Sequence, residues 1–542
     1  MKNRQIYLLL LASAILLSLP YYRFFSGIVL FIAWVPMLFV EDYLTQYREK
    51  YRSRRMFFLA WLTFLIWNLL TVYWIWNATI PGAIAAYIIN SLIMAVAFWL
   101  IHLVHRTLGD RMGYFGFLVI WTAYEHYYLN IQINFPWLLM GNGFAKDITM
   151  VQWYEYTGTL GGTFWVLFVN LLLFVLLRHY VRTDTLRGKY FELGLLGVVL
   201  ALPIGWSVIR YHTLQEKGTP VEVVVVQPNI DPYNDKFSGM SNDEQLSIIL
   251  HLADSLVTDH TDYVVVPETA INDGLLENDL SRSRSLRRIR AFVKKHPRVR
   301  FVTGATTWRI YPAGPQPTPT ARKRADGTWE DIFNAALQID TTSVIQVYHK
   351  SKLVVGVEMI PHPKLLRPLL GNILIDLGGS LGGYGTQEKR TPLVSPDSTF
   401  RVGVAICYES IFGDYVTGYV KEGANLLFVI TNDGWWGNTP GYHQHRTYAS
   451  LRAIETRRSI ARSANTGISC FIDQKGKASQ LTPWWTRDAI RGVIHTNEKK
   501  TFYTRHGDYF GRVSDFFAII LILYVIAQRL MERKQKRRTI SS

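Results

Sequence analysis

The chain has 542 residues, 49% of them hydrophobic and 14% aromatic, and it carries a formal net charge of +17. This composition is unusually apolar for a soluble protein, and the apolar residues gather in long runs, which indicates a membrane protein. A nucleotide cofactor is not expected, because the sequence contains no glycine-rich phosphate loop. Binding of nucleic acid is not expected either, because the basic residues form no clear stripe with interleaved aromatic residues.

Eight apolar runs are long enough, or nearly long enough, to cross a membrane as helices. They cover about residues 5–20, 24–40, 56–77, 81–104, 113–130, 162–178, 192–210 and 515–531. Lys2 and Arg4 precede the first run as in a signal peptide, but no clear small-x-small cleavage site follows it. We therefore expect the first helix to be retained.

The spacing of these runs predicts three parts. Residues 1–210 form a bundle of seven transmembrane helices, residues 211–511 form a globular domain, and residues 512–542 form the last transmembrane helix with a basic tail. Within residues 211–511 the sequence pattern instead predicts alternating strands, turns and charged helices.

Basic residues predict the orientation of the bundle, because cytoplasmic loops are rich in Lys and Arg. They concentrate in alternate loops, at residues 48–55, 106–111 and 178–189, and in the tail at 533–538. With both termini in the cytoplasm, these loops are cytoplasmic and the globular domain lies outside. Much of the net charge then reflects topology, and we expect the tail to meet anionic lipid headgroups.

Two cysteines are too few for a disulfide framework. Cys470 lies in a segment typical of a core strand. Cys407 follows the apolar run 401–406, where the chain turns into Glu-Ser-Ile-Phe. A thiol at such a strand end, beside the start of a helix, is expected to be exposed and to have a lowered pKa. A buried structural cysteine is the alternative.

Reactive polar residues follow several other strand-like runs. Glu268 follows residues 263–267, Lys350 follows 344–349, and Asn432 with Asp433 follows 426–431. Enzymes often build a site from distant segments in this way. Each of these residues alone is more typical of a solvated surface.

The residue types suit attack by a thiol. A carboxylate such as Glu268 can take the proton of Cys407 if burial raises its pKa. Lys350 and the backbone N–H of Tyr408 can stabilise an oxyanion. Glu358 can hold Lys350 charged and oriented.

Three segments resemble the Glu-Lys-Cys signatures of the nitrilase, or carbon–nitrogen hydrolase, superfamily: Pro267–Ala270, Tyr348–Glu358 and Ile406–Glu409. With eight spans, the resemblance narrows to the apolipoprotein N-acyltransferase family. It covers nearly the whole chain, including Phe135–Trp137, Gln227–Asn229 and Asn432–Gly437. It implies a nitrilase-like αββα sandwich inserted before the last helix of a multi-pass protein of the cytoplasmic (inner) membrane, with the sandwich in the periplasm.

The resemblance also implies roles for single residues. By position, Glu268 is the general base, Lys350 the oxyanion stabiliser and Cys407 the nucleophile. Glu358, Tyr408 and Glu409 support them. Two positions depart from the family pattern: His349 stands where Asp is usual, and Val355-Gly356-Val357 stands where Pro-Phe-Gly is common. The spacing is retained at both.

The reaction that the resemblance implies is a ping-pong acyl transfer without a cofactor. A phospholipid gives an acyl chain to Cys407 as a thioester, and lysophospholipid leaves. The α-amine of a diacylglyceryl-cysteine apolipoprotein then accepts the chain, which is the final step of bacterial lipoprotein maturation. We expect a monomer with these two substrates as partners.

The segment that follows Lys350 favours a lipid substrate independently. Apolar residues interrupted by Pro and Gly continue to Gly385 and predict a mobile lid over an acyl-chain pocket, with Leu365, Leu366 and Leu369 as candidate contacts. A packed loop is the alternative. Trp435 and Trp436 are candidate substrate-binding anchors at the membrane surface or, equally, core aromatics.

Several alternatives remain open. If His443 and His445 lie on a strand, their side chains point to the same side of it and could bind a metal ion. No third ligand stands nearby in the sequence, so no metal is expected. Glu125 inside the fifth span is a candidate functional residue, although pairing with His126 or a position at the membrane interface would also explain it. A membrane-tethered amidase would use the same triad, and an inactive lipoprotein-binding scaffold is a further rival. The spans and the apolar lid favour the transferase.

Overall fold

The computed structural model describes residues 1–359 and 383–541 and divides the chain into two compact units. The first unit consists of Met1–Tyr73, Ala83–His212 and the chain from His506 onward. The second consists of Trp74–Gly82 and Thr213–Arg505. The segment Trp74–Gly82, which lies in the sequence between two parts of the first unit, thus belongs with the second unit.

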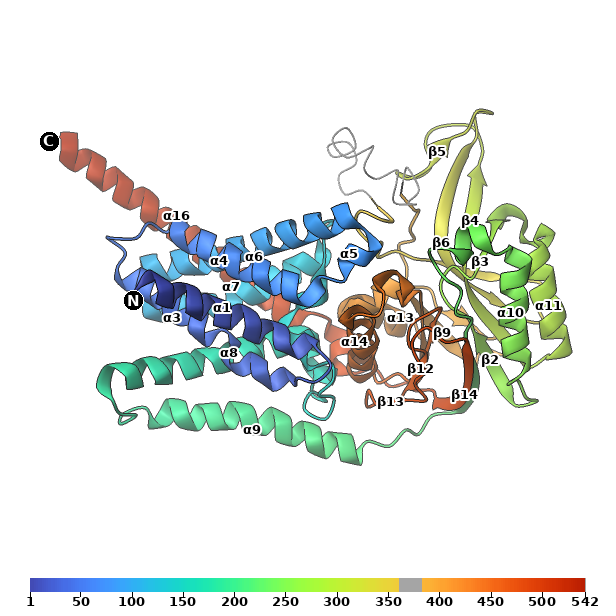
Figure 1. Cartoon of the computed structure of the whole chain (residues 1–542), viewed down its shortest axis with the longest axis horizontal. Coiled ribbons are helices and arrows are strands. Elements are labelled where there is room, and N and C mark those ends of the chain that lie inside the picture. The colour runs from blue at the N-terminus through green and yellow to red at the C-terminus, as the bar shows by residue number, and fades with distance from the viewer. Residues whose placement is uncertain (360–382, 542) are drawn as a thin grey trace. The chain divides into compact units, whose positions relative to one another are not determined.

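The first unit is helical (Figure 1). Its helices are α1 (Asn3–Ser18), α2 (Leu30–Ala33), α3 (Val35–Gln46), α4 (Arg54–Val72), α6 (Ile80–Leu108), α7 (Asp110–Asn130), α8 (Tyr154–Thr183), α9 (Tyr190–Thr213) and α16 (Tyr509–Ser541). All eight predicted apolar runs are helical in the described residues. Within residues 1–359 and 383–541, seven helical segments are long and apolar enough to cross a membrane. The helix α7 is not among them, since four tyrosines, Glu125 and His126 lower its hydropathy.

Buried polar residues join the helices of this unit. Glu125 on α7 accepts hydrogen bonds from Trp121 Nε1 (2.9 Å), Thr163 Oγ1 on α8 (2.5 Å) and the N–H of Met140 (3.1 Å). His126 does not pair with Glu125. Instead its Nδ1 lies 2.7 Å from Asp515 on α16. Glu125 therefore joins α7, α8 and the turn that begins at Met140.

The second unit is built around two β-sheets. The larger has the order β14-β1-β2-β4-β6-β5, with β3 paired to β4 and β7 to β6. Its strands are β1 (Pro220–Gln227), β2 (Thr261–Val265), β3 (Ile271–Leu276), β4 (Arg300–Tyr311), β5 (Arg322–Lys323), β6 (Trp329–Ile339), β7 (Gln346–His349) and β14 (Asp488–His495). Strands β1, β2 and β4 run parallel.

The smaller sheet has the order β13-β12-β11-β10-β9-β8. Its strands are β8 (Leu393–Val394), β9 (Arg401–Ile406), β10 (Leu426–Thr431), β11 (Ile460–Ala464), β12 (Cys470–Ile472) and β13 (Ala478–Ser479). Strands β9, β10 and β11 are parallel, so their carboxyl ends meet at one edge. Cys470 is buried in β12, as predicted, and both cysteines are free thiols.

Helices cover the outer faces of the two sheets (Figure 1). The larger sheet is covered by α10 (Asn242–Asp254) and α11 (Arg284–Lys295), whose apolar residues form one core with β1, β2 and β4. The smaller sheet is covered by α13 (Gly413–Lys421) and α14 (Pro440–Thr456). Between the sheets, Tyr263 of β2 packs on Phe428 of β10, with ring centroids 5.2 Å apart. This order of layers confirms the predicted αββα sandwich.

Two further short helices lie in the described part of the chain. They are α5 (Ile75–Ala78) in the second unit and α15 (Phe502–His506), where the chain returns to the first unit. The prediction of a strand for His443 and His445 is wrong, since both lie on α14. Threonine caps this helix at Thr439 and Pro440 begins it, which is a common sequence signature of a helix N-terminus.

Candidate active site

Cys407 directly follows the last residue of β9 and opens a short turn, Cys407–Ile411. Its backbone has φ +50°, a left-handed conformation that is unfavourable for a residue with a Cβ. The chain therefore bends sharply at the sheet edge, and such local strain is common at functional sites. The residue is half-buried at the position where the sequence predicts the nucleophile.

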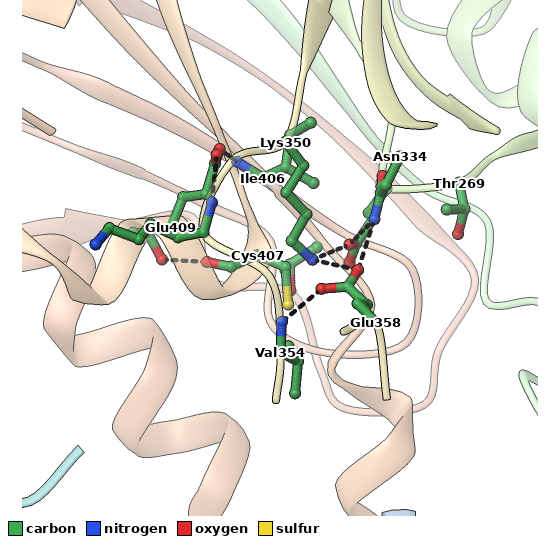
Figure 2. A network of polar contacts seen from close by, with 12 residues as sticks. Thr269, Asn334, Lys350, Val354, Glu358, Ile406, Cys407 and Glu409 are labelled. Atoms are coloured by element: carbon green, nitrogen blue, oxygen red, sulfur yellow. Dashed lines mark hydrogen bonds and ion pairs between the residues drawn. The ribbon is translucent and has the colours of Figure 1, made fainter. Parts of the chain in front are cut away.

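Lys350 lies between two carboxylates at the end of β7 (Figure 2). Its Nζ donates hydrogen bonds to Glu268 Oε1 (2.9 Å) and to Glu358 Oε1 (2.8 Å). The other oxygen of Glu358 accepts a hydrogen bond from the N–H of Val354 (2.8 Å). All three charged side chains are buried, so these contacts are shielded from water. The four predicted residues Glu268, Lys350, Glu358 and Cys407 thus come together. Figure 2 labels the last three of them.

Asn334 completes this cluster, although the sequence analysis did not identify it. Its Nδ2 donates to Glu268 Oε1 (2.8 Å) and to Glu358 Oε1 (3.0 Å). Asn334 is a buried residue of β6, and its neighbours in the sequence, Phe333 and Ala335, are apolar and also buried. A buried amide inside an apolar strand needs polar partners, and this was the available signal.

Lys236 is a second buried lysine that the sequence analysis missed. Its Nζ donates hydrogen bonds to the carbonyl oxygen of Glu268 (3.1 Å) and to Thr269 Oγ1 (2.7 Å). Burial lowers the pKa of Lys236 to about 8, while the charges of Glu268 and Cys407 oppose this effect. It lies in an irregular segment whose sequence gave no signal.

The backbone after Glu268 is also in a left-handed conformation, with φ +49° at Thr269. The neighbouring strand approaches so closely here that a Cβ at Gly304 would lie 2.5 Å from the backbone nitrogen of Thr269. Only glycine fits at this position of β4. The residue that follows the predicted base is therefore held by Gly304 on one side and by Lys236 on the other.

The buried charges shift the pKa values of the Glu268–Lys350 pair and of the Cys407 thiol differently. The expected rise of the Glu268 pKa on burial is wrong. Burial favours the neutral carboxyl of Glu268, but the charge of Lys350 and the hydrogen bonds from Lys350 and Asn334 outweigh it and lower the pKa of Glu268. Burial also opposes the charged form of Lys350, yet Glu268 and Glu358 raise its pKa well above its usual value. The lysine is therefore a fixed positive charge.

The expected lowering of the Cys407 pKa is wrong. Burial, and after it the negative charge of Glu268, raise the pKa of the thiol despite the opposing charge of Lys350. The turn after Cys407 is only five residues long, so it supplies little of the helix dipole that the expectation assumed. The resting thiol is protonated, and a base must take its proton for it to attack.

Glu409 connects the segments that carry Lys350 and Cys407. It is fully buried, and its carboxylate accepts hydrogen bonds from the N–H of Ser351 (2.6 Å) and of Ile406 (2.8 Å). The tyrosines that also donate to it are Tyr348, Tyr415 and Tyr419, at 2.8, 2.7 and 3.2 Å. Glu409 therefore joins the end of β7 to the end of β9 and positions the two predicted catalytic residues relative to one another.

The remaining predicted residues have different surroundings. The Tyr408 ring is buried and packs on Phe412, with centroids 5.2 Å apart. Trp435 and Trp436 are half-buried, and their carbonyl groups accept hydrogen bonds from Tyr233 and Asn77. Leu365, Leu366 and Leu369 lie outside the described residues. Among the described residues, no group of three His, Cys, Asp or Glu side chains could hold a metal ion.

His349, one of the two departures from the family pattern, stacks on Phe333 and lies 2.6 Å from Glu277 through its Nε2. Both side chains are buried. The histidine thus pairs with a carboxylate of the larger sheet next to Lys350.

Two family models match the chain. Residues 13–172 match the apolipoprotein N-acyltransferase N-terminal domain, and residues 223–497 match the carbon-nitrogen hydrolase. An apolipoprotein N-acyltransferase of Chlorobaculum tepidum is 29% identical over 505 residues, which are 92% of each chain. One of Geobacter metallireducens is 26% identical and covers 94% of this chain and 92% of its own. The chain therefore belongs to the apolipoprotein N-acyltransferase family of membrane-bound carbon–nitrogen hydrolases.

Proposed function

We propose that this acyltransferase takes its acyl chain from a phospholipid, carries it as a thioester on Cys407, and transfers it to the α-amine of diacylglyceryl-cysteine apolipoproteins. The observation that supports the proposal best is the buried cluster in which Lys350 lies between Glu268 and Glu358 beside Cys407 (Figure 2). One chain supplies every residue of this cluster, which supports action as a monomer.

In the first half-reaction Glu268 takes the proton of the Cys407 thiol, and the thiolate attacks the ester carbonyl of the phospholipid. Lys350 and the N–H of Tyr408 stabilise the oxyanion. When the C–O bond breaks, the leaving glycerol oxygen takes the proton from Glu268 and lysophospholipid departs. The thioester on Cys407 remains.

In the second half-reaction the α-amine of the apolipoprotein attacks the thioester carbonyl and gives a proton to Glu268. The same oxyanion contacts apply. Collapse of the tetrahedral intermediate breaks the C–S bond and forms the amide, and the proton returns from Glu268 to the thiolate of Cys407. Glu358 keeps Lys350 charged throughout, while Glu409 and the Tyr408 backbone maintain the geometry.

The placement of these reactions in the cell follows from the basic loops. We assign residues 211–511 to the catalytic domain on the periplasmic side, residues 1–210 to the seven-helix part, and residues 512–542 to the last span and a cytoplasmic tail. The excess of Lys and Arg in alternate loops and in the tail supports this orientation, with both termini in the cytoplasm.

The proposal is tested by intact-mass analysis of the purified protein after incubation with phospholipid. We expect wild type to gain one acyl chain that hydroxylamine removes and that maps to the Cys407 peptide. Cys407→Ala should gain none, whereas Cys470→Ala, which changes the buried cysteine of β12, should gain the chain normally. If wild type forms no acyl adduct but cleaves small amides, the thioester route is refuted and an amidase reaction replaces it.

A further inference from the structure

A second buried network lies behind the nucleophile, on the side of the smaller sheet. Asp433 follows β10 and is fully buried. Its Oδ2 lies 2.7 Å from Arg462 NH2, and its Oδ1 accepts a hydrogen bond from Thr431 Oγ1 (2.9 Å) and lies 2.9 Å from His445 Nδ1. The sequence analysis singled out His443 and His445 only as metal ligands, and the proposed reaction uses neither.

His445 connects this network to the nucleophile. Its Nε2 lies 3.1 Å from the carbonyl oxygen of Cys407 and 3.0 Å from Ser410 Oγ. Ser410 uses its own hydroxyl proton to donate to the same carbonyl, at 2.7 Å. A carbonyl can only accept, so His445 Nε2 carries a proton and donates it to Cys407 and Ser410. The Cys407 carbonyl therefore accepts from two side chains.

A second arm of the network reaches the thiol. Thr431, which donates to Asp433, also hydrogen-bonds the Cys407 side chain. Asp433 therefore acts on both ends of the nucleophile, on the carbonyl through His445 and on the sulfur through Thr431. Arg462 keeps Asp433 ionised, because its charge and that of His445 outweigh burial and lower the pKa of Asp433.

The position of the Cys407 carbonyl has a direct chemical consequence. The carbonyl of Cys407 and the N–H of Tyr408 belong to one planar trans peptide, in which the two bonds point in opposite directions. Fixing the carbonyl therefore fixes the direction of the N–H. The left-handed conformation of Cys407 is unfavourable by itself, so the peptide needs such contacts to keep one orientation.

We propose that His445 and Asp433 are positioning residues for acyl transfer, which hold the Cys407–Tyr408 peptide so that the Tyr408 N–H serves as an oxyanion donor. This inference rests on the proposed function, since it requires Cys407 to be the nucleophile. The two residues act through the peptide and do not themselves touch the acyl group.

The test compares His445→Gln with His445→Asn. The amide nitrogen of Gln reaches the position of Nε2, so it retains the donor to the Cys407 carbonyl, whereas the shorter Asn does not. We expect single-turnover acylation by phospholipid, measured by intact mass, to slow about 100-fold in His445→Asn, as for loss of an oxyanion-hole donor. His445→Gln should stay within about tenfold of wild type, since it keeps that donor.

Alkylation of Cys407 by iodoacetamide separates the oxyanion role from a general loss of structure. This reaction needs the thiolate but forms no oxyanion, so its rate should fall far less than acylation in His445→Asn. Asn425→Ala is the matched control, because Asn425 is equally buried and hydrogen-bonds Thr399 and Glu498 at the opposite end of the same strands. It should lose stability without a change in acylation rate per folded molecule.

The inference is overturned if His445→Asn is acylated at the wild-type rate. It is also overturned if the Gln and Asn variants slow equally, or if acylation and alkylation of His445→Asn fall by the same factor. An acyl adduct on Cys407→Ala would instead refute the proposed function. If Cys407→Ala stays unmodified while His445→Asn acylates normally, only the positioning role fails.

Discussion

Lys350→Met removes the cation from between the two buried carboxylates of the proposed site. Within the described residues, Glu268 Oε1 and Glu358 Oε1 would then share the Asn334 amide, at 2.8 and 3.0 Å, as their remaining polar contact. Breaking a buried ion pair by removal of one partner destabilises a protein by about 3–5 kcal/mol. We expect the lower end, about 3 kcal/mol, because one of the carboxyl groups can take up a proton.

The effect has a definite pH dependence. In wild type, Lys350 lowers the pKa of Glu268 below its ordinary value of 4.5, so this stabilisation is present above pH 4.5 and is lost as the pH falls further. In the variant, burial without the cation raises the same pKa, so the variant gains stability as the pH falls through the raised value. The difference between the two proteins should therefore be greatest at neutral pH and should narrow as the pH approaches 4.5.

The assay is thermal unfolding of the full chain in detergent, followed by intrinsic fluorescence of its 17 tryptophans. A loss of about 3 kcal/mol corresponds to a Tm lower by about 6 °C for a domain of this size. The double variant Lys350→Met/Glu358→Gln restores the net charge of the cluster and should recover part of this loss, while acylation of Cys407 stays absent. An unchanged Tm in Lys350→Met, or no recovery in the double variant, would refute the electrostatic reasoning.

Four further substitutions follow from the structure. We expect wild-type acylation to decline above about pH 8, where Lys236 loses its charge, and we expect Lys236→Met to be slower at neutral pH and to lack this decline. An unchanged pH profile by single-turnover mass analysis would show that the charge of Lys236 does not affect acylation. Glu409→Gln leaves one acceptor oxygen for the Ser351 and Ile406 N–H groups, so the protein should lose about 1–3 kcal/mol of stability and its acylation should slow. Tyr415→Phe should lose about 1 kcal/mol of stability. Thermal unfolding and the acylation rate check both variants. Arg452→Met leaves Glu455 buried without its guanidinium and should lose about 3–5 kcal/mol with acylation per folded molecule unchanged, which unfolding and mass analysis together would check.

Much of this organisation could be predicted from the sequence. The apolar runs predicted the helices of the first unit, because length and hydropathy decide what can cross a membrane. Glu268, Lys350 and Cys407 were identified because each follows a strand-like run and because their segments resemble the Glu-Lys-Cys signatures of the nitrilase superfamily. These signals are local, so a single sequence reveals them.

Other features depend on contacts between distant segments and gave no local signal. Asn334 interrupts an apolar strand in a way that only its buried partners explain, and Lys236 belongs to an irregular segment. The strand predicted for His443 and His445 was wrong, because two histidines at i and i+2 do not distinguish a strand from a helix without the longer pattern. The predicted direction of the Cys407 pKa is wrong, since a helix dipole was assumed, whereas burial of the thiol and, after it, the charge of Glu268 were not included.

The site draws its parts from both sheets, which makes its geometry depend on how the sheets pack. Glu268 and Lys350 follow strands of the larger sheet, β2 and β7, whereas Cys407 follows β9 of the smaller one. Glu409 bridges them directly, because it accepts hydrogen bonds from the backbone beside Lys350 and from the backbone beside Cys407. A carboxylate held by two backbone N–H groups at 2.6 and 2.8 Å leaves little freedom between the strand ends.

This bridge explains why Glu409 is as central to the proposed chemistry as the residues that react. The Lys350 ammonium must lie beside the oxyanion that forms on the acyl group of Cys407, and a displacement of about 1 Å is enough to slow such a reaction about 100-fold. Glu409 sets this separation through the main chain, while His445 sets the orientation of the Cys407–Tyr408 peptide. Glu409 and His445 therefore restrict different movements: Glu409 restricts translation between the two sheets, and His445 restricts rotation of one peptide. Glu409→Gln and His445→Asn should therefore have nearly additive effects on the logarithm of the acylation rate, and a double variant no slower than either single one would show that the two residues restrict the same movement.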